Sequence, residues 1–197
     1  AGQFAWLKLG HSSFSLSENP FSIASAPAEG PEICFVIKEL GDFTSSLGQT
    51  EVGTRAYLDG PYGSLIVDGR SEPGVAMIAG GVGVAPMLGI LQQLKQTNDP
   101  RSHRLIYANR TEDQIVCREE LADDNPILVL SEPSEGWQGE AGLIDQTLIE
   151  RSFTDAQFAT WLFVICGPVP MMDQVSLTLK EKGVSNDRIL LERFNYD

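Results

Sequence analysis

The sequence predicts a two-domain fold, with an antiparallel β-barrel domain over residues 1–70 and an α/β domain with a doubly wound parallel sheet over residues 71–197. Between residues 3 and 69, short apolar stretches alternate with Gly and Pro, which is typical of an antiparallel sheet or small barrel. From about Pro73 onward, strand-length apolar stretches alternate with helical patterns, which predicts parallel strands with helices on both faces. A glycine-rich loop that follows the first of these strands supports the second assignment.

The first domain is expected to contain four strands and a tight turn. The strands are predicted at residues 4–9, 21–24, 33–39 and 54–58, and the third has the strongest apolar pattern. The turn is predicted at residues 59–64, where two glycines flank Pro61 and Tyr62.

The second domain is expected to alternate strands and helices. Strands are predicted at residues 75–79, 104–108, 127–130, 162–166 and 189–192, and helices at residues 86–96, 113–122, 144–149 and 168–182. The first helix carries Met87, Ile90, Leu91 and Leu94 on one face, as a helix packed on a sheet should. Gly183 stands where a glycine ends a helix.

Composition excludes several classes of protein. The formal net charge of −13 argues against a nucleic-acid binder, since neutralising phosphates requires clustered cations. No apolar run approaches the roughly 18 residues of a membrane helix. The scattered Cys34, Cys117 and Cys166 favour a reducing compartment over a disulfide framework or zinc site. His11 and His103 lie in unrelated segments, so no metal site is predicted.

The clearest motif is the loop Gly80-Gly81-Val82-Gly83-Val84-Ala85-Pro86, between a predicted strand and a predicted helix. Glycines let the backbone approach a phosphate closely, and a helix N-terminus offers free N–H groups and a partial positive charge. Pro86 suits the first turn of a helix. The alternative is a glycine-rich turn that binds nothing.

Three weaker motifs accompany this loop. Cys166-Gly167-Pro168 ends a parallel strand, where open sheets bind ligands, although a buried Cys before a turn is equally common. Phe21 and Ser22 could stack on a flat ring and bond its edge, but a core Phe beside a surface Ser is the commoner arrangement. Two aromatic residues, Phe194 and Tyr196, follow the last strand, where a frayed tail is the alternative.

Together and in this order, the motifs resemble the ferredoxin–NADP reductase superfamily, and most of all its ferric reductase and NADPH oxidase branch. The resemblance runs from Gly2 nearly to the C-terminus. It implies that the first domain binds FAD and the second binds NADP(H) or NAD(H). The family barrel begins several strands before its Phe-Ser motif, so we expect an incomplete barrel in a piece of a longer protein.

The resemblance also implies flavin-binding residues. Pro20-Phe21-Ser22 is similar to the Pro-Phe-Ser/Thr of that branch, with Phe21 against the isoalloxazine and Ser22 near its reactive nitrogen. Ile23, Ala24 and Ser25 would follow along the flavin phosphates. Asn19 stands where the family has Arg or His, so an ionic contact to FAD is expected to be missing.

For the dinucleotide, the resemblance assigns the pyrophosphate to Gly80, Gly81, Gly83 and Pro86. It places the adenosine ribose near Asn109 and Arg110, and the nicotinamide near Cys166, Gly167, Pro168 and Met171. Arg110 could meet a 2′-phosphate, which favours NADPH, or could be a plain surface arginine. Phe194, in a segment similar to the family's terminal Glu-x-Phe, would cover the flavin face. Ser22, Cys166 and Phe194 are the expected catalytic residues.

The expected function is a reductase module that moves electrons from NAD(P)H through FAD to an acceptor outside the chain. By resemblance, that acceptor is a heme in a membrane domain, with this module tethered at the cytoplasmic face. One alternative is a reductase that serves an iron–sulfur or globin partner. Another is a nucleotide-sensing domain that has lost FAD, which the departure at Asn19 favours.

Overall fold

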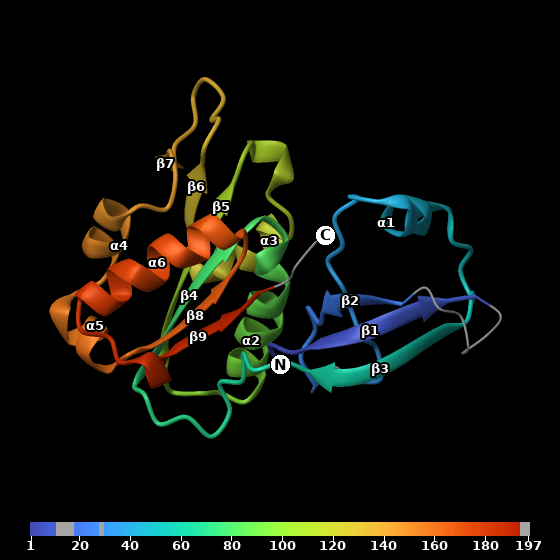
Figure 1. Ribbon diagram of the computed structural model, residues 1–197, viewed down its shortest axis with the longest axis horizontal. Helices are drawn as coiled ribbons and strands as arrows, with labels where there is room; N and C mark the ends of the chain where they lie inside the picture. Colours follow the sequence, from blue (N-terminus) through green and yellow to red (C-terminus); the bar gives the residue numbers. More distant parts are fainter. Residues whose placement is uncertain (11–17, 28–29, 194–197) are drawn as a thin grey trace.

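The protein consists of two lobes, each built on its own sheet (Figure 1). The structure, a computed structural model, describes residues 1–10, 18–27 and 30–193. A three-stranded antiparallel sheet in the order β2-β1-β3 forms the smaller lobe, and a six-stranded sheet in the order β7-β6-β5-β4-β8-β9 forms the larger lobe. This arrangement confirms the predicted two-part fold class.

The smaller sheet is built around β1 (Phe4–Leu9), which pairs with β2 (Asn19–Ser22) on one side and β3 (Ala56–Tyr62) on the other. Alternate residues of β1, Ala5 and Leu7, are buried, as expected of a strand with one covered face. A short helix, α1 (Asp42–Ser46), and a 3₁₀ turn, η2 (Leu47–Gln49), lie between β2 and β3.

Two predictions for this lobe are wrong. Residues 33–39 form no strand beyond a single bridge between Ile23 and Phe35, although their apolar pattern is strong. A strand needs a neighbour along its length to take its backbone hydrogen bonds, and apolar alternation does not supply one. The predicted turn at residues 59–64 is instead mostly strand, because β3 continues to Tyr62 after a register shift opposite Phe4 and Trp6.

The larger sheet is entirely parallel. Its strands are β4 (Gly74–Gly80), β5 (Ser102–Asn109), β6 (Ile127–Leu130), β7 (Glu140–Ala141), β8 (Leu162–Cys166) and β9 (Ile189–Glu192). Every residue of β4 and β8 is buried, which explains their continuous apolar sequence. The chain winds from β4 out to β7 and then crosses to β8, so the winding direction reverses between β4 and β8.

Helices cover both faces of this sheet (Figure 1). Val75, Met77 and Ala79 of β4 pack with α2 (Val84–Gln96) and α3 (Arg118–Leu121) in one core. Ala76 and Ile78 point to the other face, where the core includes α4 (Gln146–Ser152), α5 (Asp155–Thr160) and α6 (Val169–Glu181). Each face is therefore closed by its own apolar layer.

The helices of the larger lobe differ from the sequence prediction in two places, and α1 of the smaller lobe was not predicted. The helix expected at residues 113–122 is reduced to α3 and the flanking 3₁₀ turns η4 (Glu112–Gln114) and η5 (Ala122–Asp124), because Cys117 has a left-handed φ of 54° that interrupts it. Helix α5 was not predicted, although Thr154 and Gln157 form the capping box that begins it. The last 3₁₀ turn, η6 (Asn186–Arg188), leads into β9.

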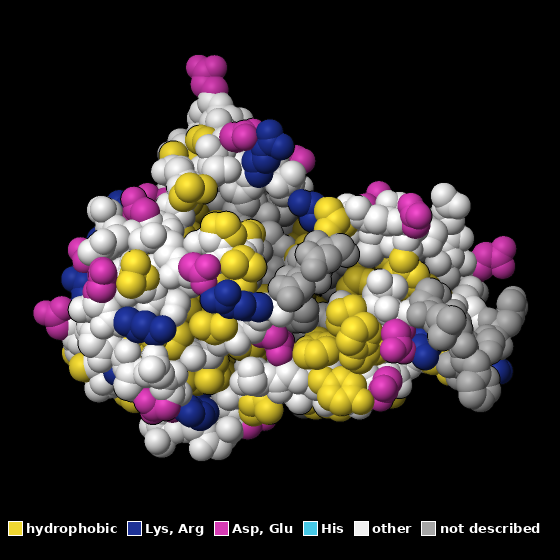
Figure 2. All heavy atoms as spheres, in the orientation of Figure 1, with side chains coloured by type: hydrophobic (Ala, Val, Ile, Leu, Met, Phe, Trp, Pro, Cys, Tyr) yellow, Lys and Arg dark blue, Asp and Glu magenta, His cyan; other side chains and the backbone are white. Residues whose placement is uncertain are grey.

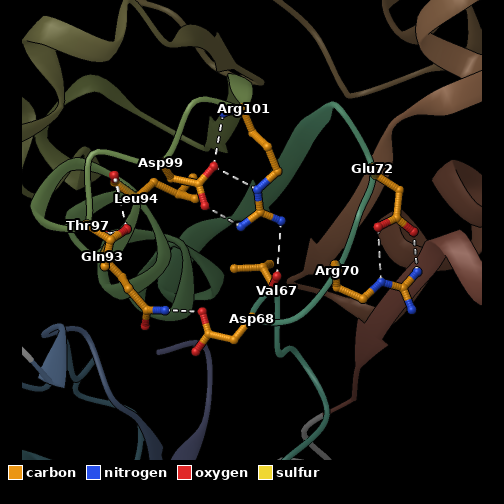
Figure 3. Close-up of polar contacts among 9 residues, drawn as sticks. All are labelled: Val67, Asp68, Arg70, Glu72, Gln93, Leu94, Thr97, Asp99 and Arg101. Carbon is orange, nitrogen blue, oxygen red and sulfur yellow. Dashed lines mark hydrogen bonds and ion pairs between the residues drawn. The ribbon is translucent and has the colours of Figure 1, made fainter.

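The segment that joins the two sheets is fixed to the larger lobe by polar contacts (Figure 3). Arg101 donates from Nε and Nη2 to the Asp99 carboxylate, at 2.9 and 2.7 Å, and from Nη1 to the Val67 carbonyl oxygen, at 3.0 Å. Gln93 of α2 donates to the Asp68 carboxylate. Leu65 and Val67 are fully buried in the core beneath α2, so the connection is anchored by both polar and apolar contacts.

Within the described residues, no helix is both long enough and apolar enough to cross a membrane.

Replacing Arg101 with Gln should destabilise the protein by about 2 kcal/mol, since charged hydrogen bonds to Asp99 and Val67 are lost. The Arg101 hydrogen bonds hold the pKa of Asp99 below its ordinary value, so this stabilisation is lost as pH falls through the pKa of Asp99 in the folded state. Urea unfolding at pH 7 and at pH 3 measures both effects.

The matched control is Arg118→Gln, which breaks an exposed pair with Glu112 and should cost no more than about 0.5 kcal/mol. Equal losses for the two variants would contradict the account of the Arg101 anchor.

Candidate functional site

The larger sheet has a topological switch point at the carboxyl ends of β4 and β8, where open parallel sheets bind ligands. Ala79 and Cys166 are paired across these strands, so the loops that leave them lie side by side. On either flank, Gly80 pairs with Ala108 of β5 and Cys166 pairs with Glu192 of β9. We call this row of strand ends, with the loops that leave them, the carboxyl edge.

Glycines allow the two central loops to touch. A Cβ at Gly83 would lie 2.2 Å from the Cys166 carbonyl oxygen, and one at Gly80 would lie 2.8 Å from both Pro168 and the Met171 sulfur. Gly81 differs, because its φ is +54° and a Cβ there would meet nothing within 4 Å. Gly80 and Gly83 are therefore needed for packing, whereas Gly81 leaves open space at the edge.

Helices α2 and α6 both begin at this edge, and both have N-termini suited to an anion. Neither has a side-chain cap or an acidic residue in its first turn. By contrast, α4, which follows β7, is capped by Asp145, and α5 is capped by Thr154. An uncapped N-terminus keeps the positive end of the helix dipole available to a phosphate.

At the β8–β9 side of the edge, the Cys166 thiol is buried beside the Glu192 carboxylate. Burial, with a smaller effect from the Glu192 charge, raises the pKa of Cys166 to about 12, so the thiol is protonated at neutral pH. The Ser64 amide donates to Glu192 Oε1 at 3.2 Å, while Oε2 is buried without a partner. Burial also raises the pKa of Glu192.

At the β5 side, Asn109 has a buried side-chain Nδ2 without a partner, although its side chain lies near the Tyr107 hydroxyl. Asn109 Nδ2 and Glu192 Oε2 are the two buried side-chain polar atoms without a hydrogen bond among the described residues. Both lie on the carboxyl edge, on either side of β4 and β8. Since a buried orphan costs about 1–3 kcal/mol, this placement indicates a polar ligand along the edge.

Arg110 follows Asn109 and is exposed, but it is not free. Its Nε lies 2.8 Å from Glu132 Oε1, just beyond the end of β6.

In the smaller lobe, the predicted flavin residues share β2 and its continuation. Asn19, Pro20, Phe21 and Ser22 form β2, and all are partly exposed. The Phe21 ring stacks on Phe43 with centroids 6.0 Å apart and an interplanar angle of 18°. Phe43 carries no motif that could mark it in the sequence, so one face of Phe21 is covered by a residue that the pattern does not reveal.

Beyond β2, the chain passes against the larger lobe. Ala24 and Ser25 are buried, and the Ser25 hydroxyl accepts a hydrogen bond from the Cys34 amide at 3.0 Å. A Cβ at Gly89 of α2 would lie 3.1 Å from the Ser25 carbonyl oxygen and 3.2 Å from that of Ile23. The same helix thus begins at the dinucleotide loop and packs on the predicted flavin segment.

Contacts across the lobes also bring Ser64 to Glu192, which are 128 residues apart in sequence. The sequence marks Glu192 only as part of the terminal Glu-x-Phe likeness and gives no sign of this contact. Strand pairing also brings Ser22 near this contact. Ser22 of β2 pairs with Phe4 of β1, and Phe4 pairs with Tyr62 of β3, which lies two residues before Ser64. Phe194 lies outside the described residues.

Other surface features are less suited to a ligand. Residues 68–73 and 99–101 line a hollow of about 520 Å³ at the amino ends of β4 and β5, but its arginines are already paired, Arg70 with Glu72 and Arg101 with Asp99. Apolar side chains gather over the smaller sheet near its border with the larger lobe (Figure 2). Leu58 and Tyr62 of β3 are among the exposed large hydrophobic residues. Among the described residues, no cluster of three potential metal ligands occurs.

The sequence of this chain is similar to those of known oxidoreductases. A family model for the oxidoreductase NAD-binding domain matches residues 77–176. The chain is 31% identical to the reductase component of propane 2-monooxygenase from Mycolicibacterium goodii, over 98% of this chain and 58% of the relative. It is 30% identical to NADH-cytochrome b5 reductase 2 from Rattus norvegicus, over 77% of this chain and 64% of the relative. The chain thus spans less than two thirds of the length of each of these relatives.

Solved structures with the same fold include the ferredoxin reductase in carbazole 1,9a-dioxygenase, with a TM-score of 0.84, 24% identity and coverage of 98% of this chain and 60% of that one. Another is a ferredoxin NADP⁺ reductase from Neisseria gonorrhoeae with bound FAD and NADP, with a TM-score of 0.75, 21% identity and coverage of 98% and 85%. The two-lobe architecture is therefore that of ferredoxin reductases.

The three cysteines should differ in reactivity toward iodoacetamide at pH 8. Cys34 is exposed and should react rapidly, whereas Cys166 is buried with a raised pKa and should react only on unfolding. Mass spectrometry of native and denatured samples measures the difference. Because the folded-state pKa of Cys166 is raised, its stabilisation should be lost as pH rises from 9.0 toward 12.

Native alkylation of Cys166 at the rate of Cys34 would show that the thiol is not enclosed at the carboxyl edge.

Proposed function

Because the chain belongs to the oxidoreductase NAD-binding domain family and has the fold of ferredoxin reductases, we propose that it is an NAD(P)H-dependent, FAD-containing reductase module. It passes electrons to an acceptor outside the chain. The observation that supports this most strongly is the position of the two buried, unpartnered polar atoms, Asn109 Nδ2 and Glu192 Oε2, on one ligand-binding edge. We also propose a flavin domain over residues 1–70 and a nucleotide domain over residues 71–197, which the presence of two separate sheets supports.

The dinucleotide would lie along the carboxyl edge. Gly81 and the N-termini of α2 and α6 would receive the pyrophosphate, since this is where the edge offers open space and uncapped helix ends. Gly80, Gly83, Gly167 and Pro168 shape the two loops, with Met171 packed over Gly80 and Pro86 in the first turn of α2. Asn109 would meet the adenosine end through its unpartnered amide.

The flavin would lie at the junction between β2 and the carboxyl edge. Phe21 stacks on Phe43 and makes an edge contact with Phe35, so it would meet the flavin with the surface that these two rings leave open. Ser22 ends β2 beside it. Ile23, Ala24 and Ser25 would hold the phosphate side, and their backbone is fixed there by Gly89 of α2. Asn19 and Pro20 begin β2, where Asn19 can donate a neutral hydrogen bond.

When bound, the two cofactors would supply the redox chemistry, hydride donation by NAD(P)H and onward electron transfer by the flavin. The residues of the two lobes would hold the cofactors at the carboxyl edge. A neutral, buried Cys166 suits contact with an uncharged nicotinamide ring, because a thiolate there would require solvation. Glu192, anchored through Ser64 of the other lobe, offers its second oxygen to the same space. Phe194, two residues later, would cover the flavin.

The acceptor is proposed as a protein-bound redox centre. Two relatives are named as the reductase component of a monooxygenase and as an NADH-cytochrome b5 reductase, and these names support a protein acceptor for this chain. The likeness of Pro20-Phe21-Ser22 to the ferric reductase branch supports a heme-bearing membrane domain as one such acceptor, with this module on the cytoplasmic face. The alternative, a nucleotide-sensing domain that has lost FAD, is supported only by the uncharged Asn19.

The test is the absorption spectrum of the chain after loading with FAD and desalting, followed by anaerobic addition of NADH or NADPH. Retained flavin bands that bleach are expected. In Gly81→Ala the bands should remain but bleach at least about tenfold more slowly, because the added methyl fills the open space at the pyrophosphate position.

The control is Gly136→Ala, which places a methyl at an equally open, positive-φ glycine in the β6–β7 loop and should bleach at the wild-type rate. Retained flavin that neither nucleotide bleaches would contradict the reductase function, and equal slowing of both variants would contradict the role of Gly81.

A further inference from the structure

Arg110 and Glu132 form an exposed ion pair at the predicted adenosine end of the carboxyl edge. The Ser131 amide donates to the Asn109 carbonyl oxygen at 3.1 Å, and the Glu132 amide donates to that of Arg110 at 2.8 Å. These bonds continue the β5–β6 pairing beyond the strands and set the two side chains beside one another, with Arg110 Nε 2.8 Å from Glu132 Oε1. The arginine that could meet a 2′-phosphate is therefore already neutralised.

The chain on either side of the pair carries a net negative charge. Residues 110–113 and 131–135, which follow β5 and β6, contain one arginine and four acidic residues. One of these acidic residues, Glu112, is paired with Arg118. A 2′-phosphate carries close to two negative charges and would lie near these carboxylates, so this end of the edge opposes it electrostatically.

In dinucleotide-binding sheets, the end of the second strand meets the adenosine ribose, and an available arginine there accommodates a 2′-phosphate. In this chain Arg110 occupies that position but is held by a carboxylate on the neighbouring strand end. Binding of NADPH would require Arg110 to leave Glu132 and would place the phosphate beside the released carboxylate. A free 2′-hydroxyl carries no charge and has neither cost.

We propose that this module uses NADH in preference to NADPH, and that Glu132 is the specificity-determining residue, acting by neutralising Arg110. This rests on the proposed function, since it concerns the same dinucleotide site. It replaces the preference for NADPH that Arg110 suggests when the sequence is considered without its partner.

The test isolates the adenosine end with 5′-AMP and 2′,5′-ADP, titrated into the 197-residue chain and followed by NMR. The wild type should bind 5′-AMP at least as tightly as 2′,5′-ADP. In Glu132→Gln, affinity for 2′,5′-ADP should rise about tenfold, while affinity for 5′-AMP should change less than about twofold, since only the phosphate senses the removed charge. The double variant Arg110→Gln/Glu132→Gln should lose most of the gain.

The matched control is Glu112→Gln, which removes another exposed carboxylate that is paired with an arginine, Arg118, and should leave the preference unchanged. A wild type that prefers 2′,5′-ADP, a Glu132→Gln variant without a gain, or an equal gain in Glu112→Gln would overturn the specificity proposal alone. Failure of every variant to bind either nucleotide would overturn the dinucleotide site itself, and with it the proposed function.

Discussion

The close approach of two backbone loops, where β4 and β8 end, is the constraint on which the site depends. The winding of the sheet reverses between these strands, so their loops leave side by side. With a Cβ at Gly83 only 2.2 Å from the Cys166 carbonyl oxygen, no other residue permits this spacing without a backbone shift. The contact therefore sets the positions of both the glycine loop and Cys166, and with them the N-termini of α2 and α6.

Helix α2 transmits this constraint to the smaller lobe. Its first turn belongs to the carboxyl edge, while Gly89, one turn later, lets the Ile23–Ser25 backbone lie directly on the helix. The contact between Ser64 and Glu192 closes the junction from the other side. The predicted flavin segment and the predicted nucleotide loop therefore both contact the same helix, which fixes their relative position. Two cofactor rings that must stack require such a fixed position.

The sequence predicts the larger lobe well because β4 and β8 are buried on both faces and so read as unbroken apolar runs. Residues 33–39 show the same apolar character but pair only at Phe35, and pairing depends on a neighbour that pattern cannot reveal. The motifs of the site are likewise local, and they lead to Cys166 and the glycines. The residues that contact the predicted site residues are distant from them in sequence, so the motifs do not reveal them. Phe43 stacks on Phe21, Ser64 bonds Glu192, and Glu132 pairs with Arg110.

Hydrogen exchange of the chain with and without saturating NAD⁺ tests the central claim, that the dinucleotide lies along the carboxyl edge. Protection should appear in the amides of residues 80–85 and 166–172, at the two loops and the first turns of α2 and α6, and should be absent from residues 68–73 and 99–101 at the opposite edge. Protection confined to that opposite hollow, with the loops unchanged, would place the ligand elsewhere and contradict the account.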